Sequence, residues 1–280
     1  MSYLSKKFEK FLIFFRKKEG GGRSANPEAT RGAADPQSVD SRKERGYNIL
    51  KREFFMIAEN VKHALAEIAG GNPFGEKITL VAATKTRTPD EINEAVAAGI
   101  SDIGENKVQE FTAKYDAVHG ANRHFIGHLQ TNKVKYLIGK THLIQSLDRM
   151  ELADELQKRA ARAGWVCDCL IEVNIGSELS KSGVSLEEAE AAYTALRGYE
   201  NLRVRGLMAM LPLSDDAALL SGLCQKMRAL FEALREHDEA IAYLSMGMSG
   251  DWRLCVEHGS NMIRLGTSLF GPRRLPAPAE

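Results

Sequence analysis

The clearest fold signal in the sequence is Ile78-Thr79-Leu80-Val81-Ala82-Ala83-Thr84-Lys85, which continues directly into Thr86-Arg87-Thr88-Pro89-Asp90-Glu91. Residues 78–83 carry no charge, as expected of a parallel strand that is covered on both faces. Thr88 to Glu91 form a helix-capping sequence, and Gly99 is placed to end that helix. A buried strand followed at once by a helix is typical of an α/β fold.

Lys85 is an unusual residue at the end of a buried strand, because an ammonium group loses its hydration there unless it is paired. Burial or a nearby cation lowers the pKa of a lysine. The neutral amine can then attack a carbonyl and form a Schiff base. Alternatively, the long side chain of Lys85 extends to solvent and has no chemical role. This segment alone leaves both interpretations open.

Length and composition limit the class of protein. The chain has 280 residues, is 44% hydrophobic and carries a net charge of +1, which suits an α/β protein and argues against nucleic acid as the main partner. Its four cysteines are too sparse for a disulfide framework, which indicates reduced thiols in a cytoplasmic protein. The sequence contains no run of 18 consecutive apolar residues, so no transmembrane helix is predicted.

The N-terminal part differs from the rest. Residues 1–48 carry 11 Lys and Arg against 6 Asp and Glu, a net of +5, so residues 49–280 carry 27 against 31, a net of −4. Phe8 to Phe15 lie among lysines and could form a basic amphipathic helix at a membrane surface or a partner. An extension without a fold of its own is the alternative, because residues 20–45 have few large apolar side chains. We therefore predict an N-terminal extension, mostly disordered, over residues 1–47, a barrel over 48–275 and a tail over 276–280.

Strand and helix signals alternate along the chain after the opening stretch. Eight such strands fit a (β/α)8 TIM barrel better than an open doubly wound sheet, and no Gly-x-Gly-x-x-Gly follows the first strand. The predicted strands cover residues 78–83, 100–104, 124–128, 142–147, 166–174, 202–210, 242–246 and 262–265.

In such a barrel the functional site lies at the carboxyl ends of the strands, and a phosphate often binds after strands seven and eight. The sequence there is Ser245-Met246-Gly247-Met248-Ser249-Gly250-Asp251 and Arg264-Leu265-Gly266-Thr267-Ser268. Small and hydroxylated residues let backbone N–H groups approach an anion. Together with Lys85 they indicate a phosphorylated carbonyl compound, for which pyridoxal phosphate is the obvious candidate.

Seven segments along the chain carry a specific resemblance. They resemble those of the pyridoxal phosphate homeostasis proteins, whose barrel is similar to the N-terminal domain of alanine racemase. In order, the segments are Ala83-Thr84-Lys85-Thr86, Gly104-Glu105-Asn106-Lys107, His124-Phe125-Ile126-Gly127-His128, Asn174 with Ser180-Lys181-Ser182-Gly183, Gly206-Leu207-Met208-Ala209-Met210, Leu244-Ser245-Met246-Gly247-Met248-Ser249 and Arg264-Leu265-Gly266-Thr267.

This resemblance implies that pyridoxal 5'-phosphate is bound covalently, as an aldimine on Lys85. An arginine at the pyridine nitrogen cannot accept a proton from it, so the ring nitrogen stays unprotonated and the ring is a weaker electron sink. The implied cofactor-binding residues are Lys85, Asn106, Met246, Ser249, Arg264, Gly266 and Thr267, with Ser249, Gly266 and Thr267 at the phosphate and Arg264 at the ring nitrogen.

The resemblance further implies a non-catalytic, monomeric carrier that supplies or buffers pyridoxal phosphate. Its partners would be the cofactor and pyridoxal-phosphate-dependent apo-enzymes. A pyridoxal-phosphate-dependent racemase is one alternative, although such an enzyme draws a second acid/base from a further domain. A cofactor-free barrel enzyme acting on a sugar phosphate is another. No His, Cys, Asp and Glu cluster has metal-ligand spacing, so no metal is predicted.

Overall fold

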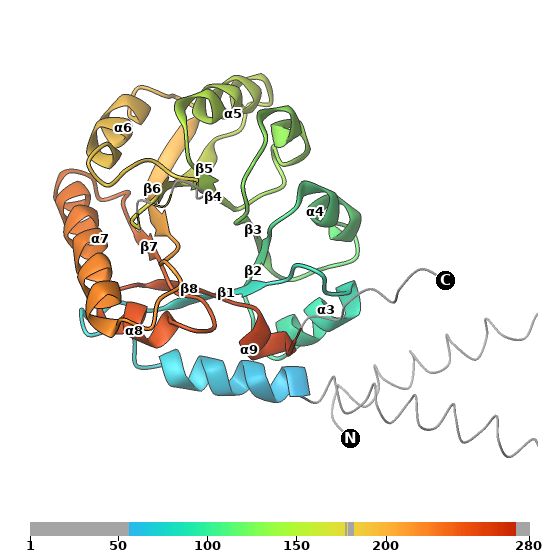
Figure 1. The fold of residues 1–280 in the computed structure, drawn as a ribbon. Coiled ribbons are helices and arrows are strands. Elements are labelled where there is room, and N and C mark those ends of the chain that lie inside the picture. Colours follow the sequence, from blue (N-terminus) through green and yellow to red (C-terminus); the bar gives the residue numbers. More distant parts are fainter. Residues whose placement is uncertain (1–55, 177, 179–181, 273–280) are drawn as a thin grey trace, which may run out of the picture. The chain divides into compact units, whose positions relative to one another are not determined.

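The computed structural model describes residues 56–176, 178 and 182–272. In this part of the chain eight parallel strands alternate with helices and close into a barrel (Figure 1). The prediction of a (β/α)8 barrel is therefore confirmed. The predicted N-terminal extension, its basic helix, the short C-terminal tail, and Ser180 and Lys181 lie outside the described residues, so the domain boundaries stay predictions.

The strands form a single closed sheet in chain order, so that β8 pairs with β1. They are β1 (Thr79–Ala83), β2 (Asp102–Glu105), β3 (Asn122–Phe125), β4 (Leu143–Leu147), β5 (Cys167–Val173), β6 (Leu202–Ala209), β7 (Tyr243–Ser245) and β8 (Met262–Leu265). A helix over residues 56–68 precedes them. The later helices are α3 (Pro89–Ala97), α4 (Val108–Lys114), the 3-10 helix η1 (Thr131–Tyr136), α5 (Met150–Arg162), α6 (Ala189–Leu196), α7 (Ala217–His237), α8 (Trp252–Glu257) and α9 (Thr267–Phe270).

The opening βα unit forms as its sequence predicts. Thr88 is the N-cap of α3, where its side chain accepts from the backbone N–H of Glu91 and the Glu91 side chain accepts from the N–H of Thr88. On β1, Val81 lies opposite Asp102 of β2 and opposite Arg264 of β8. This pairing closes the barrel at the strand that carries Lys85 at its end.

The third strand was predicted too late in the chain. It was expected over residues 124–128 but covers Asn122–Phe125, because Asn122 pairs with Asp102 of β2 and its N–H bonds to the carbonyl of Ser101. Gly127 belongs to the loop beyond the strand. A Cβ there would lie 2.2 Å from the backbone oxygen of Asn106, an approach that only glycine allows.

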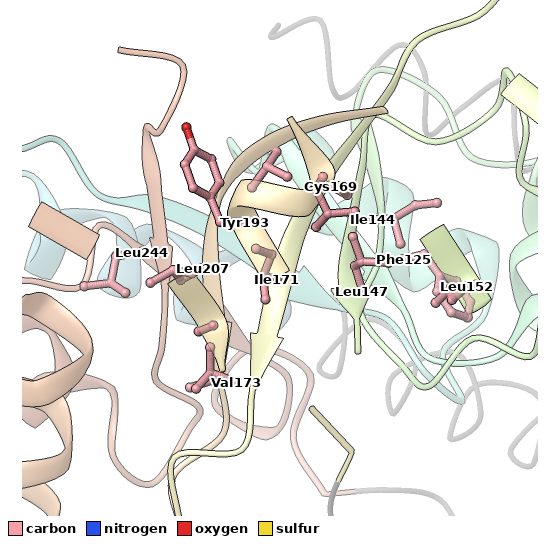
Figure 2. Close-up of a cluster of buried hydrophobic side chains, with 14 of the residues drawn as sticks. Phe125, Ile144, Leu147, Leu152, Cys169, Ile171, Val173, Tyr193, Leu207 and Leu244 are labelled. Carbon is pink, nitrogen blue, oxygen red and sulfur yellow. The ribbon is translucent and has the colours of Figure 1, made fainter. Parts of the chain in front are cut away.

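Apolar side chains fill both sides of the sheet. The barrel interior holds a layer of Val81, Leu143, Leu170, Met208 and Met262. Figure 2 shows part of the larger outer cluster, where side chains of the strands meet Leu152 of α5 and Tyr193 of α6. Burial on both faces explains why β1 contains no charged residue. Among the described residues, no helix is both long and apolar enough to cross a membrane.

Candidate functional site

The turn that holds Lys85 is fixed on both sides of the lysine. Thr84 donates its backbone N–H to Gly104 (2.9 Å) and its hydroxyl to Oε1 of Glu105 (2.7 Å). Thr86 donates its N–H to Oε2 of Glu110 (2.7 Å) and has a φ of 65°, the one positive φ among non-glycine residues in the part of the chain described. A strained residue of this kind persists only where its surroundings hold it, and such residues concentrate at functional sites. Lys85 is half-buried between these two anchored threonines.

A buried ion cluster lies beneath this turn. Nζ of Lys114, the last residue of α4, donates to Oε1 of Glu105 (2.8 Å), to Oε2 of Glu110 (3.1 Å) and to the carbonyl of Thr84 (2.9 Å). Burial raises the pKa of Glu105, while Lys114 acts in the opposite direction. The cluster ties the ends of β1 and β2 together and thereby holds the turn around Lys85.

Asn106 follows β2 and is half-buried. Its Oδ1 is buried and has no hydrogen-bond partner among the described residues. The contact of Gly127 with the Asn106 backbone holds this segment against the loop after β3. Leaving a buried amide oxygen unpaired costs about 1–3 kcal/mol, so a polar ligand at this position would stabilise the site.

The segments after β7 and β8 meet at a cradle of small residues. Oγ of Ser249 accepts from the N–H groups of Gly266 (3.4 Å) and Ser268 (3.3 Å). A Cβ on Gly266 would lie 3.4 Å from the carbonyl oxygen of Ala83, so the end of β8 lies close to the end of β1. Thr267 is exposed beside Gly266. The structure thus brings together the three residues predicted at the phosphate, and their N–H and hydroxyl groups suit an anion.

Arg264 is buried inside the barrel on β8. Its Nη1 donates to the carbonyl oxygen (2.9 Å) and Oγ (2.5 Å) of Ser245, and its Nη2 donates to the carbonyl of Ala209 (2.9 Å). These bonds fix the guanidinium in one orientation. An arginine held in this way donates hydrogen bonds and cannot accept a proton at neutral pH.

Met246 is placed differently from the other predicted residues. Its side chain is fully buried in the outer cluster with Leu244 and Cys255. Trp252, which the sequence places next to the phosphate loop, is also buried, in a second outer cluster. It packs against Gly247, where a Cβ would come within 2.8 Å of the Trp252 Cα.

The sequence interpretation missed several residues around the site. Besides Lys114 and Glu110, the main one is Glu172 of β5, a buried carboxyl whose pKa is raised to about 7 by burial and by the like charge of Asp148. A single glutamate within the apolar run of β5 was a usable signal. Nδ1 of His128 lies 2.9 Å from Oδ2 of Asp148, whereas His124 points into the barrel interior.

This geometry defines a single-barrel protein with a lysine, a cradle of small residues and an anchored arginine at the strand ends. Residues 61–274 match the family of the alanine racemase N-terminal domain. A pyridoxal phosphate homeostasis protein of Aquifex aeolicus is 45% identical over 198 residues, covering 70% of this chain and 87% of that protein. One of Escherichia coli K12 is 35% identical over 215 residues, covering 75% and 91%. The chain belongs to the family of the pyridoxal phosphate homeostasis proteins.

Solved structures agree with this assignment. PipY of Synechococcus elongatus, with pyridoxal phosphate bound, has a TM-score of 0.66 and 32% identity, and the match covers 77% of this chain and all of that one. Alanine racemase of Clostridium difficile, with cycloserine, has a TM-score of 0.65 at 14% identity and covers 81% of this chain and 61% of its own. At that identity the likeness extends to the fold alone.

Proposed function

We propose that this protein binds pyridoxal 5'-phosphate at the carboxyl end of its barrel and serves in the intracellular homeostasis of that cofactor. The observation that carries the proposal is the buried Oδ1 of Asn106, which has no hydrogen-bond partner among the described residues. Asn106 follows β2, and β2 pairs with β1, the strand that leads to Lys85. Relatives at up to 45% identity are named for this homeostasis, and the PipY structure contains the cofactor.

The residues present fit the cofactor in charge and in chemistry. Lys85 supplies the amine for a covalent linkage to the aldehyde carbon, and the anchored turn holds it at the barrel mouth. Ser249, Gly266 and Thr267 supply hydroxyl and N–H donors for the phosphate. Arg264 would face the ring nitrogen as a donor, and Asn106 would lie beside the ring. Met246 is assigned to the site by resemblance alone, since its side chain packs in the outer cluster.

A carrier role is favoured over racemisation by Arg264. Its guanidinium already donates to Ser245 and Ala209, and it leaves a ring nitrogen unprotonated, which disfavours carbanion chemistry. In this proposal the cofactor passes to pyridoxal-phosphate-dependent apo-enzymes. The names of the relatives and the PipY complex also count against a cofactor-free enzyme acting on a sugar phosphate.

Absorbance tests the proposal directly. The purified protein should show a visible band after addition of pyridoxal phosphate, and Lys85→Ala and Lys85→Arg should both lack it. Lys158→Ala, which removes an exposed lysine of α5, is the control and should keep the band. A wild-type protein that stays colourless and takes up no cofactor would refute cofactor binding. Racemisation of amino acids at about 1 per second or faster would refute the carrier role.

Residues 1–55 are proposed to be dispensable for binding. A truncated variant that begins at Met56 should keep its affinity for pyridoxal phosphate. Loss of binding in that variant would show that residues 1–55 are part of the fold. Sedimentation of the full chain would test the predicted monomer.

A further inference from the structure

A chain of buried polar side chains crosses the barrel interior from Arg264 to the opposite wall. Nη1 of Arg264 on β8 contacts Oγ of Ser245 on β7 (2.5 Å), and that hydroxyl contacts Oε1 of Gln145 on β4 (2.7 Å). Nε2 of Gln145 lies 2.9 Å from Nδ1 of His124 on β3, and Nε2 of His124 lies 3.1 Å from Oδ1 of Asp102 on β2. All five residues are buried among the apolar interior layer.

The chemistry of its first member gives this chain a direction. Arg264 can only donate, so Oγ of Ser245 accepts from it and directs its single hydrogen to Oε1 of Gln145. That contact orients the amide, and its Nε2 therefore donates to Nδ1 of His124. The second amide hydrogen points to Sδ of Met262 (3.2 Å). A ring nitrogen that accepts carries no proton, so the other one, Nε2, is the N–H that donates to Asp102.

The far end of the chain requires the same direction. Hydrogen bonds from His124, from Ser101 (2.6 Å) and from Asn122 (3.1 Å) overcome the effect of burial and lower the pKa of Asp102 to about 2, so it is a carboxylate that accepts. Burial lowers the pKa of His124, and Asp102 partly offsets this by raising it. The ring of His142, whose centroid is 5.6 Å from that of His124, lowers the pKa further. A neutral His124 with its proton on Nε2 satisfies both neighbours.

We propose that Ser245, Gln145 and His124 are positioning residues for Arg264, and that they form a one-way donor chain that links the arginine to the carboxylate of Asp102. Each donor in such a chain polarises the next, which strengthens the bonds in an interior of low polarity. These hydrogen bonds keep the Arg264 guanidinium rigid and aimed at the ring nitrogen. This last step rests on the proposed function, whereas the chain and its direction do not.

The direction is tested without any cofactor. Nitrogen NMR of the His124 ring in the full-length protein should show an unprotonated Nδ1 and a protonated Nε2 at neutral pH. A proton on Nδ1 would require the Gln145 amide to be reversed and would overturn the direction of the chain. Ser146→Ala is the control, because Ser146 neighbours Gln145 on β4 and its buried hydroxyl has no partner among the described residues. This variant should leave the His124 spectrum unchanged.

The link to the site is tested by titrating pyridoxal phosphate into the Gln145→Leu and Ser245→Ala variants. Ser245→Ala removes only a hydroxyl group, so it keeps the test valid if Gln145→Leu fails to fold. Loss of one net hydrogen bond should weaken binding about fivefold in each. Both should also shift the bound absorption band, which a purely structural defect would leave in place, while Ser146→Ala should match the wild type.

The two proposals fail in different ways. A wild-type protein that binds no cofactor would refute the proposed function. The His124 spectrum would still test the direction of the hydrogen bonds between Arg264 and Asp102. Wild-type affinity and an unshifted band in both Gln145→Leu and Ser245→Ala would overturn the positioning role.

Discussion

Replacing Lys114 by methionine should destabilise the protein through the buried carboxylate that it leaves behind. The Lys114 and Glu105 side chains are 14% and 5% exposed, and the lysine makes three hydrogen bonds. Breaking a buried ion pair by removing one partner typically costs about 3–5 kcal/mol. Because Thr84 still donates to Glu105, we expect a loss near the lower limit, about 3 kcal/mol of unfolding free energy at neutral pH.

The loss should depend on pH, and its sign follows from Glu105. The pKa of this carboxyl is already raised from the ordinary value of 4.5, and removing Lys114 raises it further. Between the ordinary value and the higher folded value, the folded state binds more protons than the unfolded state. Stability of the variant therefore falls as pH rises through this window. The deficit of Lys114→Met should be small near pH 4.5 and full above the folded pKa.

Urea unfolding at pH 5 and pH 7.5 measures both effects. Lys158→Met is the matched control, since Lys158 is 55% exposed and lies 3.8 Å from Glu155. A surface pair of this kind contributes at most about 1 kcal/mol. Adding Glu105→Gln to Lys114→Met should recover about 2 kcal/mol, because the charge then disappears with its partner. A deficit no larger than that of the control, or one independent of pH, would refute this reasoning.

Three further changes test other features of the structure. Thr86→Gly should raise the unfolding free energy by about 1 kcal/mol, because glycine adopts the positive φ of 65° without strain; a loss in urea unfolding would contradict this. Gly127→Ala should lower the unfolding free energy by at least about 2 kcal/mol, because its Cβ would lie 2.2 Å from the Asn106 backbone. The control is Gly222→Ala in α7, which has open space around it and should be neutral or stabilising in the same assay. The raised pKa of Glu172 makes the folded state the stronger proton binder between pH 4.5 and about 7, so the stability of the wild type should fall by about 3 kcal/mol across this range. Glu172→Gln should remove this fall. An unchanged pH profile would show that Glu172 is ionised normally.

Much of the site was accessible from the sequence because it follows local patterns. The places of Lys85, Ser249 and Gly266 follow from the strands predicted before them, whereas Asn106 was assigned by resemblance to the family. The barrel topology brings all four places to one end of the sheet. The roles of these residues remain predictions. Their positions follow from the closed sheet itself.

The residues that support the site were not accessible in the same way. Lys114 looks like an ordinary charge on a helix until α4 places its Nζ against Glu105. The start of β3 looks like a loop because Asn122 and Arg123 are polar, yet pairing with β2 makes it a strand. Local pattern and propensity are poor guides wherever a neighbouring element supplies the compensating partner.

Local sequence is enough to predict the alternation of strands and helices, and with it the place of Lys85 at the mouth of the barrel. These features depend on apolar runs and caps within a few residues of one another. The hydrogen-bond partners of Arg264, by contrast, depend on how the strands come together in the folded barrel. Ser245 and Gln145 are 100 residues apart, and Gln145 and His124 are 21 apart, so no local pattern relates them. Closure of the barrel brings these strands together, and the cost of burying an unpaired polar group then requires the side chains to bond in one order.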